Sequence, residues 1–331
     1  MKILVTGATG FVGSHLVEKL FSMGHEVVSL VRNLEKYEKL GLPGQFLQGD
    51  LSNSSVDNWI ENLPEDLDAF IHTAGIVHSF QSNSFYNINT EATKSLFNKL
   101  KKQIPKLNFV FISSMAASGP SKSIETPLTE ETPLDPPSDY GKSKMLAEKF
   151  LLKHTPDNWA LTIIRPPMVI GPRDEAVLDV FKMVKSRVVL NTGIKGSKKT
   201  YSFICVFDLV DAIIKTLEKR ERGKEIYFVS FPKAVQFKEI IGEIAKQMKV
   251  GFLSLPLPFF IINIFAKILR LLNRTFGLDF RLTPDKTHEL KPSSWVCSSQ
   301  KSEQQLEMTY RWDLEKTIKV TLKDYKERGW I

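Results

Sequence analysis

Residues 3–13, ILVTGATGFVG, decide the fold of this 331-residue chain. The apolar run Ile3–Thr6 predicts a buried strand, and the pattern of Phe11–Phe21 predicts a helix directly after it. Gly7 allows a tight turn between them, Gly10 lets the backbone approach a pyrophosphate, and Gly13 lets the helix pack close to the strand. The helix N-terminus offers phosphates its free N–H groups and the positive end of its dipole. The spacing is GxxGxxG rather than GxGxxG, and its place between strand and helix predicts a dinucleotide site made by Gly7, Thr9, Gly10, Phe11, Val12 and Gly13.

The first half of the chain continues this alternation of strands and helices. Further strands are expected at Glu26–Val31, Phe46–Gln48, Ala69–His72, Phe109–Ser113 and Leu161–Arg165, and helices at Val56–Asn62, Phe85–Lys102 and Tyr140–His154. Strands that alternate with helices form a parallel sheet covered on both faces. The predicted fold class is therefore α/β, a doubly wound parallel sheet of the Rossmann type.

The second half of the chain does not continue this regular alternation of strands and helices. We expect a loop at Asn191–Thr200, strands at Phe203–Val206 and Ile226–Ser230, and helices at Asp208–Glu218 and Phe237–Met248. Few strand signals follow them. We predict a dinucleotide-binding domain at residues 1–170, to which 203–230 returns, and a smaller, mainly helical substrate-binding lobe formed by 171–202 and 231–331.

Composition excludes several classes of protein. Hydrophobic residues make up 42% and charged residues 25%, which is too apolar for a disordered chain. Two cysteines cannot form a disulfide framework, and the short apolar run at the N-terminus is no signal peptide, so we expect a cytoplasmic protein. The net charge of +8 is spread along the chain without a dense basic tract, so nucleic-acid binding is not expected. The six histidines lack metal-ligand spacing, and no metal is expected.

Arg32 bears on the choice of dinucleotide. An acidic residue at the end of the second strand binds the ribose hydroxyls of NAD. Here Val31 and Arg32 end that strand. A guanidinium would pair with a 2′-phosphate, which a carboxylate would repel. The sequence therefore favours NADP over NAD and leaves NAD as the alternative.

Tyr140 and Lys144 stand four residues apart, on one face of their predicted helix. A tyrosine with an ordinary pKa near 10 is a poor acid–base group at neutral pH, and a nearby ammonium lowers that pKa. Tyr140 is the only one of the seven tyrosines with a lysine at this spacing. Upstream, Ser113 and Ser114 end a strand, where a hydroxyl either polarises a substrate carbonyl or simply terminates the strand.

Together these residues resemble the extended short-chain dehydrogenase/reductase family, the superfamily of NAD-dependent epimerases and dehydratases. The matching motifs are Thr6–Gly13, Gly49–Leu51, His72–Gly75, Ile112–Pro120, Asp139–Lys144, Arg165–Asp174 and Phe203–Ala212. The resemblance implies a catalytic set of Ser114, Tyr140 and Lys144, with Ser114 chosen over Ser113 by its spacing from Gly119. It implies further cofactor contacts from Asp50, Leu51, Thr73, Ala74, Gly75, Asn89, Tyr140, Lys144, Pro167 and Val169, in addition to the glycine turn and Arg32.

Departures from the family pattern narrow the expected chemistry. Met115 and Ala116 follow Ser114 where the dehydratases carry an Asp-Glu pair, and Met168 stands where nucleotide-sugar epimerases have an asparagine. The chain looks closest to the 3β-hydroxysteroid dehydrogenase-like and carbonyl reductase branch. This predicts an NAD(P)-dependent oxidoreductase that interconverts a hydroxyl and a ketone on a hydrophobic small molecule. A nucleotide-sugar epimerase or reductase is the alternative, and a cofactor-binding regulatory or scaffold protein is an alternative of another class.

Residues 258–274 predict an amphipathic helix with Lys267, Arg270 and Arg274 on one face and Ile264, Ile268 and Leu272 on another. Such a helix either roofs the substrate pocket or makes peripheral contact with an anionic membrane, and the sequence favours the roof. The family resemblance also implies a homodimer as an open alternative, packed through helices such as Phe85–Lys102 and Tyr140–His154.

Overall fold

Strand β1 (Lys2–Thr6) is an interior strand of the main sheet, between β4 and β2, and is buried on both faces. The computed structural model describes residues 1–64, 66–219, 223–278 and 280–331. Within them, a seven-stranded parallel sheet has the order β11-β6-β5-β4-β1-β2-β3. The other strands of this sheet are β2 (Glu26–Val31), β3 (Gln45–Gln48), β4 (Ala69–His72), β5 (Asn108–Ile112), β6 (Ala160–Arg165) and β11 (Gly223–Phe228). The fold class expected from the sequence is confirmed.

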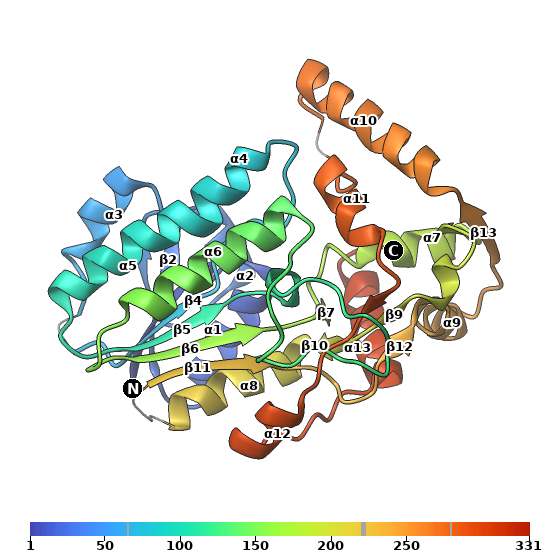
Figure 1. Ribbon diagram of the computed structural model, residues 1–331. Helices are drawn as coiled ribbons and strands as arrows, with labels where there is room; N and C mark the ends of the chain where they lie inside the picture. The colour runs from blue at the N-terminus through green and yellow to red at the C-terminus, as the bar shows by residue number, and fades with distance from the viewer. Residues whose placement is uncertain (65, 220–222, 279) are drawn as a thin grey trace.

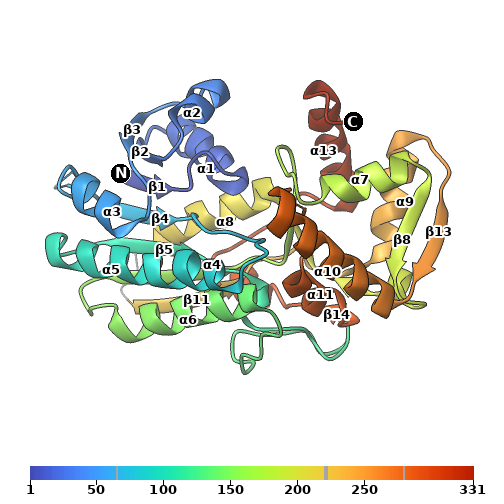
Figure 2. The same ribbon diagram turned by 90° about the horizontal axis from the view of Figure 1, so that it is seen from above.

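Helices cover both faces of this sheet (Figures 1 and 2). One face packs against α1 (Phe11–Ser22), α2 (Leu34–Leu40) and α8 (Val206–Lys219), and the other against α3 (Asn53–Ile60), α5 (Ala92–Gln103) and α6 (Asp139–His154). The strands are runs of apolar residues because both of their faces are buried. This sandwich holds the carboxyl ends of the strands at one edge, where chemistry in such folds takes place.

A second group of elements packs around its own core. Helices α7 (Leu178–Lys185), α9 (Phe237–Met248) and α13 (Leu314–Glu327) share buried side chains that include Phe181 and Tyr325. The remaining elements of this half are β7 (Met168–Ile170) paired with β10 (Phe203–Cys205), β8 (Val188–Thr192) paired with β13 (Leu253–Leu257), a small sheet of β12 (Val235–Gln236), β9 (Thr200–Tyr201) and β14 (Ser294–Trp295), and helices α10 (Phe259–Phe276), α11 (Pro284–Leu290) and α12 (Gln300–Gln305).

Three expectations about secondary structure were wrong in part. The helix expected over Phe85–Lys102 is broken into α4 (Ser82–Phe85), a π-helical segment over Tyr86–Glu91, and α5. The expected loop at Asn191–Thr200 starts inside strand β8. The strand at Phe203–Val206 pairs with β7 and stays outside the main sheet, whereas β11 joins that sheet beside β6.

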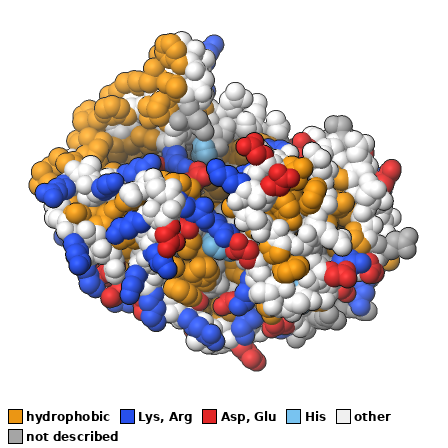
Figure 3. Space-filling view, turned by 180° about the vertical axis from the view of Figure 1, so that it is seen from behind, with side chains coloured by type: hydrophobic (Ala, Val, Ile, Leu, Met, Phe, Trp, Pro, Cys, Tyr) orange, Lys and Arg blue, Asp and Glu red, His pale blue; other side chains and the backbone are white. Residues whose placement is uncertain are grey.

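Helix α10 extends away from the rest of the fold (Figure 1). In Figure 3 it forms the arm at the upper left, with hydrophobic side chains along its outer edge. Among the described residues, no helix is long and apolar enough to cross a membrane.

Candidate functional site

The site residues expected from the sequence gather at the carboxyl edge of the main sheet. They lie on the segments that leave β1, β2, β3, β4, β5 and β6, and Asn89 and the pair Tyr140 and Lys144 reach the same edge from the π-helical segment and α6. The strand order reverses between β1 and β4, which opens a crevice at this point in doubly wound folds. The structure therefore brings one contiguous group together.

The turn between β1 and α1 requires its glycines. Gly7 has φ +69, and a Cβ there would lie 2.7 Å from Thr73 Oγ1. A Cβ on Gly13 would lie 2.1 Å from the Gly7 carbonyl oxygen, so only glycine allows α1 to start this close to β1. The Gly10 N–H donates to Gly7 O at 2.8 Å and closes the turn. Thr9, Phe11 and Val12 belong to the same turn and the first turn of α1, whose N-terminus supplies N–H donors to a phosphate.

The segment after β4 forms the neighbouring wall. Thr73 Oγ1 donates to Thr6 O at 2.6 Å, and the Ala74 N–H points to Thr6 Oγ1 at 3.4 Å. Asn89 is 1% exposed and forms paired hydrogen bonds with the backbone of Ile76, at 2.9 and 3.0 Å. A Cβ on Gly75 would meet Asn89 Oδ1 at 2.9 Å. Asn89 thus holds the backbone after β4 in place and acts as a positioning residue.

Arg32 and Asp50 lie at the same edge of the sheet, on the segments that follow β2 and β3. Arg32 is exposed just after β2. Asp50 accepts hydrogen bonds from Ser52 N and Oγ, at 2.7 and 2.6 Å, and these bonds, with a smaller contribution from Arg32, lower the pKa of its carboxyl. Leu51 follows and packs partly against the core. Because Asp50 is already satisfied by Ser52, the Arg32 guanidinium keeps its capacity to bind an anion.

Ser114, Tyr140 and Lys144 meet between β5 and α6. The Ser114 side chain lies close enough to the Tyr140 phenol to lower its pKa, and Ser114 Oγ accepts from the Ala116 N–H at 3.1 Å. Lys144 is 4% exposed, its Nζ donates to Ile112 O at 2.8 Å, and it would lie 3.4 Å from a Cβ on Gly75. Gly141 permits the approach, because a Cβ there would lie 2.4 Å from Ala116 O. Ser114 and Tyr140 can therefore act on one bound oxygen, and Lys144 lies beside Gly75 on the cofactor wall.

Burial shifts the pKa values of Tyr140 and Lys144. Burial raises the pKa of Tyr140 to about 12, the hydrogen bond from Ser114 opposes this, and the Glu289 carboxylate adds to it. Burial also lowers the pKa of Lys144 to about 8. Burial is the largest effect on the pKa of Tyr140, and the expectation that Lys144 and an oxidised nicotinamide together lower it stays a prediction. A cation bound beside the phenol would be needed to favour the phenolate.

Residues after β6 complete the crevice. Pro167 is half-buried, and Val169 lies in β7, partly packed against the core behind α1. Ser113 Oγ is buried and has no hydrogen-bond partner within the described ranges. A buried hydroxyl without a partner is costly, so its position at this edge fits a site that receives a polar ligand.

Two carboxylates of α11 were not foreseen from the sequence. Asp285 accepts from the Asp139 N–H at 2.6 Å and the Tyr140 N–H at 3.3 Å, at the N-terminus of α6. Glu289 accepts from Ser138 Oγ at 2.8 Å, and Ser138 Oγ in turn accepts from the Gly141 N–H. These contacts join residues about 150 positions apart in the sequence, and no local pattern predicts them.

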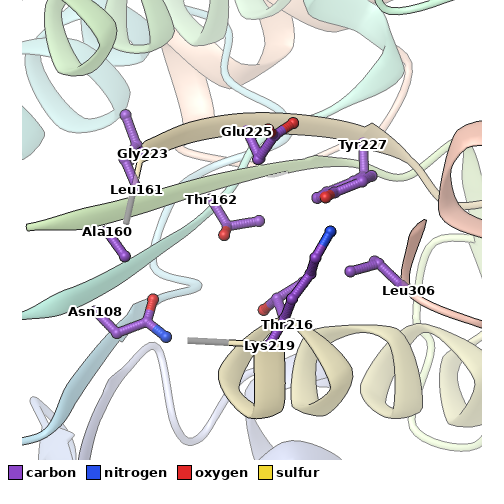
Figure 4. A pocket seen from close by; sticks show the side chains of 10 residues that line it. All are labelled: Asn108, Ala160, Leu161, Thr162, Thr216, Lys219, Gly223, Glu225, Tyr227 and Leu306. Carbon is purple, nitrogen blue, oxygen red and sulfur yellow. The ribbon is translucent and has the colours of Figure 1, made fainter. Parts of the chain in front are cut away.

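A separate small cavity lies between β5, β6, β11 and α8 (Figure 4). Its volume is about 20 Å³, and Asn108, Ala160 and Gly223 on its wall start their strands, so it lies at the amino ends, away from the crevice. It holds a water molecule at most and is no substrate site. In the described part of the chain, no cluster of three or more histidine, cysteine or acidic side chains could hold a metal ion.

Comparisons with known proteins agree with this geometry. The family described as "NAD dependent epimerase/dehydratase family" matches residues 3–230. A UDP-glucose 4-epimerase of Vibrio cholerae is 28% identical over 88% of this chain and 90% of its own length. An Escherichia coli O157:H7 protein, N-acetyl-alpha-D-glucosaminyl-diphospho-ditrans,octacis-undecaprenol 4-epimerase, is 26% identical over 78% of this chain and 75% of its own length. A solved structure of UDP-glucuronic acid 4-epimerase from Bacillus cereus, in complex with UDP-glucuronic acid and NAD, superposes with a TM-score of 0.77 at 20% identity, over 99% of this chain and 100% of the other.

Proposed function

The chain belongs to the NAD dependent epimerase/dehydratase family, and from this membership we propose that it is a 4-epimerase of a sugar whose anomeric carbon carries a diphosphate ester. The observation that carries the proposal is the meeting of Ser114, Tyr140 and Lys144 beside the glycine turn. The relatives named above supply the substrate class. The proposal replaces the hydrophobic ketone, the first choice from the sequence, with the alternative that the relatives favour.

The turn fits a dinucleotide, since glycine at positions 7 and 13 lets α1 start close to β1, with the first N–H groups of α1 available to a pyrophosphate. A dinucleotide held by the glycine turn and Lys144 would supply a reversible hydride acceptor for the sugar carbon, so that the epimerisation involves no net oxidation. Tyr140 takes the proton of the sugar hydroxyl in the first half and gives it back in the second. Ser114 hydrogen-bonds the same oxygen, and Lys144 holds the cofactor ribose.

The test is conversion of UDP-glucose and of an undecaprenyl-diphosphate-linked N-acetylglucosamine, followed by chromatography of the released sugars without added reductant. We expect one epimer pair to interconvert, and Tyr140→Phe to slow it by a factor of about 10²–10⁴. Tyr310→Phe is the matched control, because its hydroxyl bonds Ser302 and none of the proposed site residues. Normal turnover by Tyr140→Phe would refute the mechanism.

Reduction of an apolar ketone remains a second candidate, favoured by Met168, which is half-buried in β7 near the crevice. Methionine offers an apolar surface and no hydrogen-bond donor for a diphosphate. NADPH consumption with aliphatic ketones of graded polarity, in the absence of any epimerisation, would select this function instead.

For the cofactor, we propose that Arg32 lets the crevice accept NADP as well as NAD. Arg32 is exposed at the end of β2, where a carboxylate would select NAD. The solved neighbour described above contains NAD, which fits the rest of the cradle equally well. We expect Arg32→Ala to weaken NADP⁺ binding roughly tenfold or more and to leave NAD⁺ binding nearly unchanged. Equal effects on both cofactors, measured by calorimetry, would contradict this role.

A further inference from the structure

Helix α10 turns a wide apolar face to solvent. Phe260 is 65% exposed, Leu271 63% and Phe276 68%, and Ile264, Phe265 and Ile268 are exposed as well. The helix packs on the protein through the opposite side, where Ile262 and Ala266 are buried. The expectation that the apolar face of this helix roofs the substrate pocket is therefore wrong. Contiguous exposed apolar side chains of this kind mark an interaction surface.

The apolar surface continues at the root of the helix. Gly193 N–H donates to Leu257 O at 2.8 Å, which places the neighbouring loop beside the start of α10. Ile194 at the tip of that loop is 90% exposed. Strand β13 leads directly into α10, and its Leu253 and Leu255 are also exposed. Large apolar side chains thus project from a loop, a strand and a helix that adjoin one another.

The charged side chains that α10 itself carries have one sign. Residues 249–278 contain no acidic side chain, and Lys267, Arg270 and Arg274 are exposed along one edge of the apolar face. A cavity of about 320 Å³ beside the start of α10 is lined by the exposed Lys195 and Lys291, by Phe259, and by the buried Lys199, whose Nζ donates to Leu290 O; no carboxylate lines it. Exposed apolar groups edged by lysine and arginine complement an anionic bilayer, where the apolar groups enter the interface and the cations meet the headgroups.

We propose that the surface formed by α10, Ile194 and the lysine-lined cavity docks the protein on an anionic membrane. No helix among the described residues is suited to cross a bilayer, so the contact is peripheral. It is independent of the proposed reaction, because it uses none of the residues at the carboxyl edge of the sheet. The outer edge of α10 projects freely in Figure 3, so a flat surface can reach it.

The test uses the full-length protein and sucrose-loaded vesicles of phosphatidylcholine, with and without one-third phosphatidylglycerol, at about 0.05 M and about 0.5 M salt. We expect sedimentation with the anionic vesicles at low salt and weaker binding at high salt. The double variant F260S/L271S should lose binding roughly 100-fold, because each exposed side chain enters the interface. The triple variant K267Q/R270Q/R274Q should lose roughly 100-fold on anionic vesicles only.

Two control variants remove the same kinds of side chain, an exposed aromatic ring and three exposed positive charges, from other helices. Phe21→Ser removes an aromatic side chain that is 48% exposed on α1, and the triple variant K319Q/K323Q/K326Q removes three exposed charges of α13. Both should bind like the parent protein, and circular dichroism should show that all variants fold. Absence of vesicle binding overturns the proposal, as does equal loss in the controls. Concentration-dependent self-association that F260S/L271S abolishes, without vesicle binding, would overturn it in favour of a second copy.

Discussion

Replacing Gly13 by alanine tests the cofactor cradle most directly. An ideal Cβ on Gly13 would lie 2.1 Å from Gly7 O, 2.8 Å from Gly7 C and 3.0 Å from Ala8 Cα. Since Cβ atoms do not approach other heavy atoms closer than 3.0 Å, the turn and α1 must separate by about 0.9 Å. Overpacking of this kind costs about 1–3 kcal/mol, and the helix propensity of alanine returns up to about 1 kcal/mol. We expect a net loss of about 1–2 kcal/mol and a melting temperature lower by a few degrees.

The larger effect falls on cofactor binding. A displacement of 0.9 Å takes the N–H groups at the start of α1 out of the distance range of a phosphate hydrogen bond. One hydrogen bond to a charged group contributes about 1.5–3 kcal/mol, so Kd should rise roughly 10- to 100-fold. Calorimetric titration with NAD⁺ and NADP⁺ measures this change.

Gly242→Ala is the matched control. It lies inside helix α9, and a Cβ there would have nothing within 4 Å. We expect it to stabilise the protein by up to about 1 kcal/mol and to leave Kd unchanged. A folded Gly13→Ala variant whose Kd stays within about twofold of the parent would refute the assignment of this turn to the cofactor.

Three further substitutions test the interior of the site. His72 is fully buried, and burial lowers its pKa to about 3 from 6.5. The unfolded chain therefore binds the proton first as the pH falls, and the free energy of unfolding should decrease by about 2 kcal/mol between pH 6.5 and 5. In urea denaturation at a series of pH values, His72→Gln should make this decrease smaller, and an unchanged pH dependence would contradict the reasoning. Glu289→Gln removes a charge that raises the pKa of Tyr140, so the pH–rate profile of sugar oxidation should move to lower pH; no movement, or movement to higher pH, would show that Glu289 does not act on the phenol. Glu148→Ala leaves the buried Arg165 without its carboxylate at 2.6 Å and should cost about 3–5 kcal/mol in thermal unfolding, so a loss below about 1 kcal/mol would count against a buried pair.

Local sequence patterns predict the elements of the main sheet and the turn at Gly7. These features depend on neighbours in the chain, where apolar periodicity and glycine placement are direct signals. The π-helical segment around Asn89 escaped detection, because one extra residue in a turn leaves the apolar pattern on both sides intact. Helical spacing correctly put Lys144 near Tyr140, but it could not show that the Lys144 ammonium donates to Ile112 O.

The contacts of the α11 carboxylates with α6 cannot be predicted from local sequence patterns. Asp285 meets the N–H groups of Asp139 and Tyr140 from 146 and 145 residues away. Capping of a helix is foreseen when the cap is adjacent in sequence, as with Ser138. When a distant segment supplies a second cap, only the packing of α11 on α6 reveals it.

The packing of α11 on α6 also affects the pKa of the Tyr140 phenol. Asp285 and Glu289 stabilise the positive end of α6, and Glu289 at the same time raises the pKa of the Tyr140 phenol, which burial has already raised. Lys144 donates to a carbonyl and does not offset this rise. Burial and Glu289 therefore favour the protonated phenol of Tyr140, and a positive charge placed beside it would favour the phenolate that accepts a substrate proton. An oxidised nicotinamide carries such a charge and a reduced one does not, so proton uptake by Tyr140 would be coupled to the redox state of the bound cofactor.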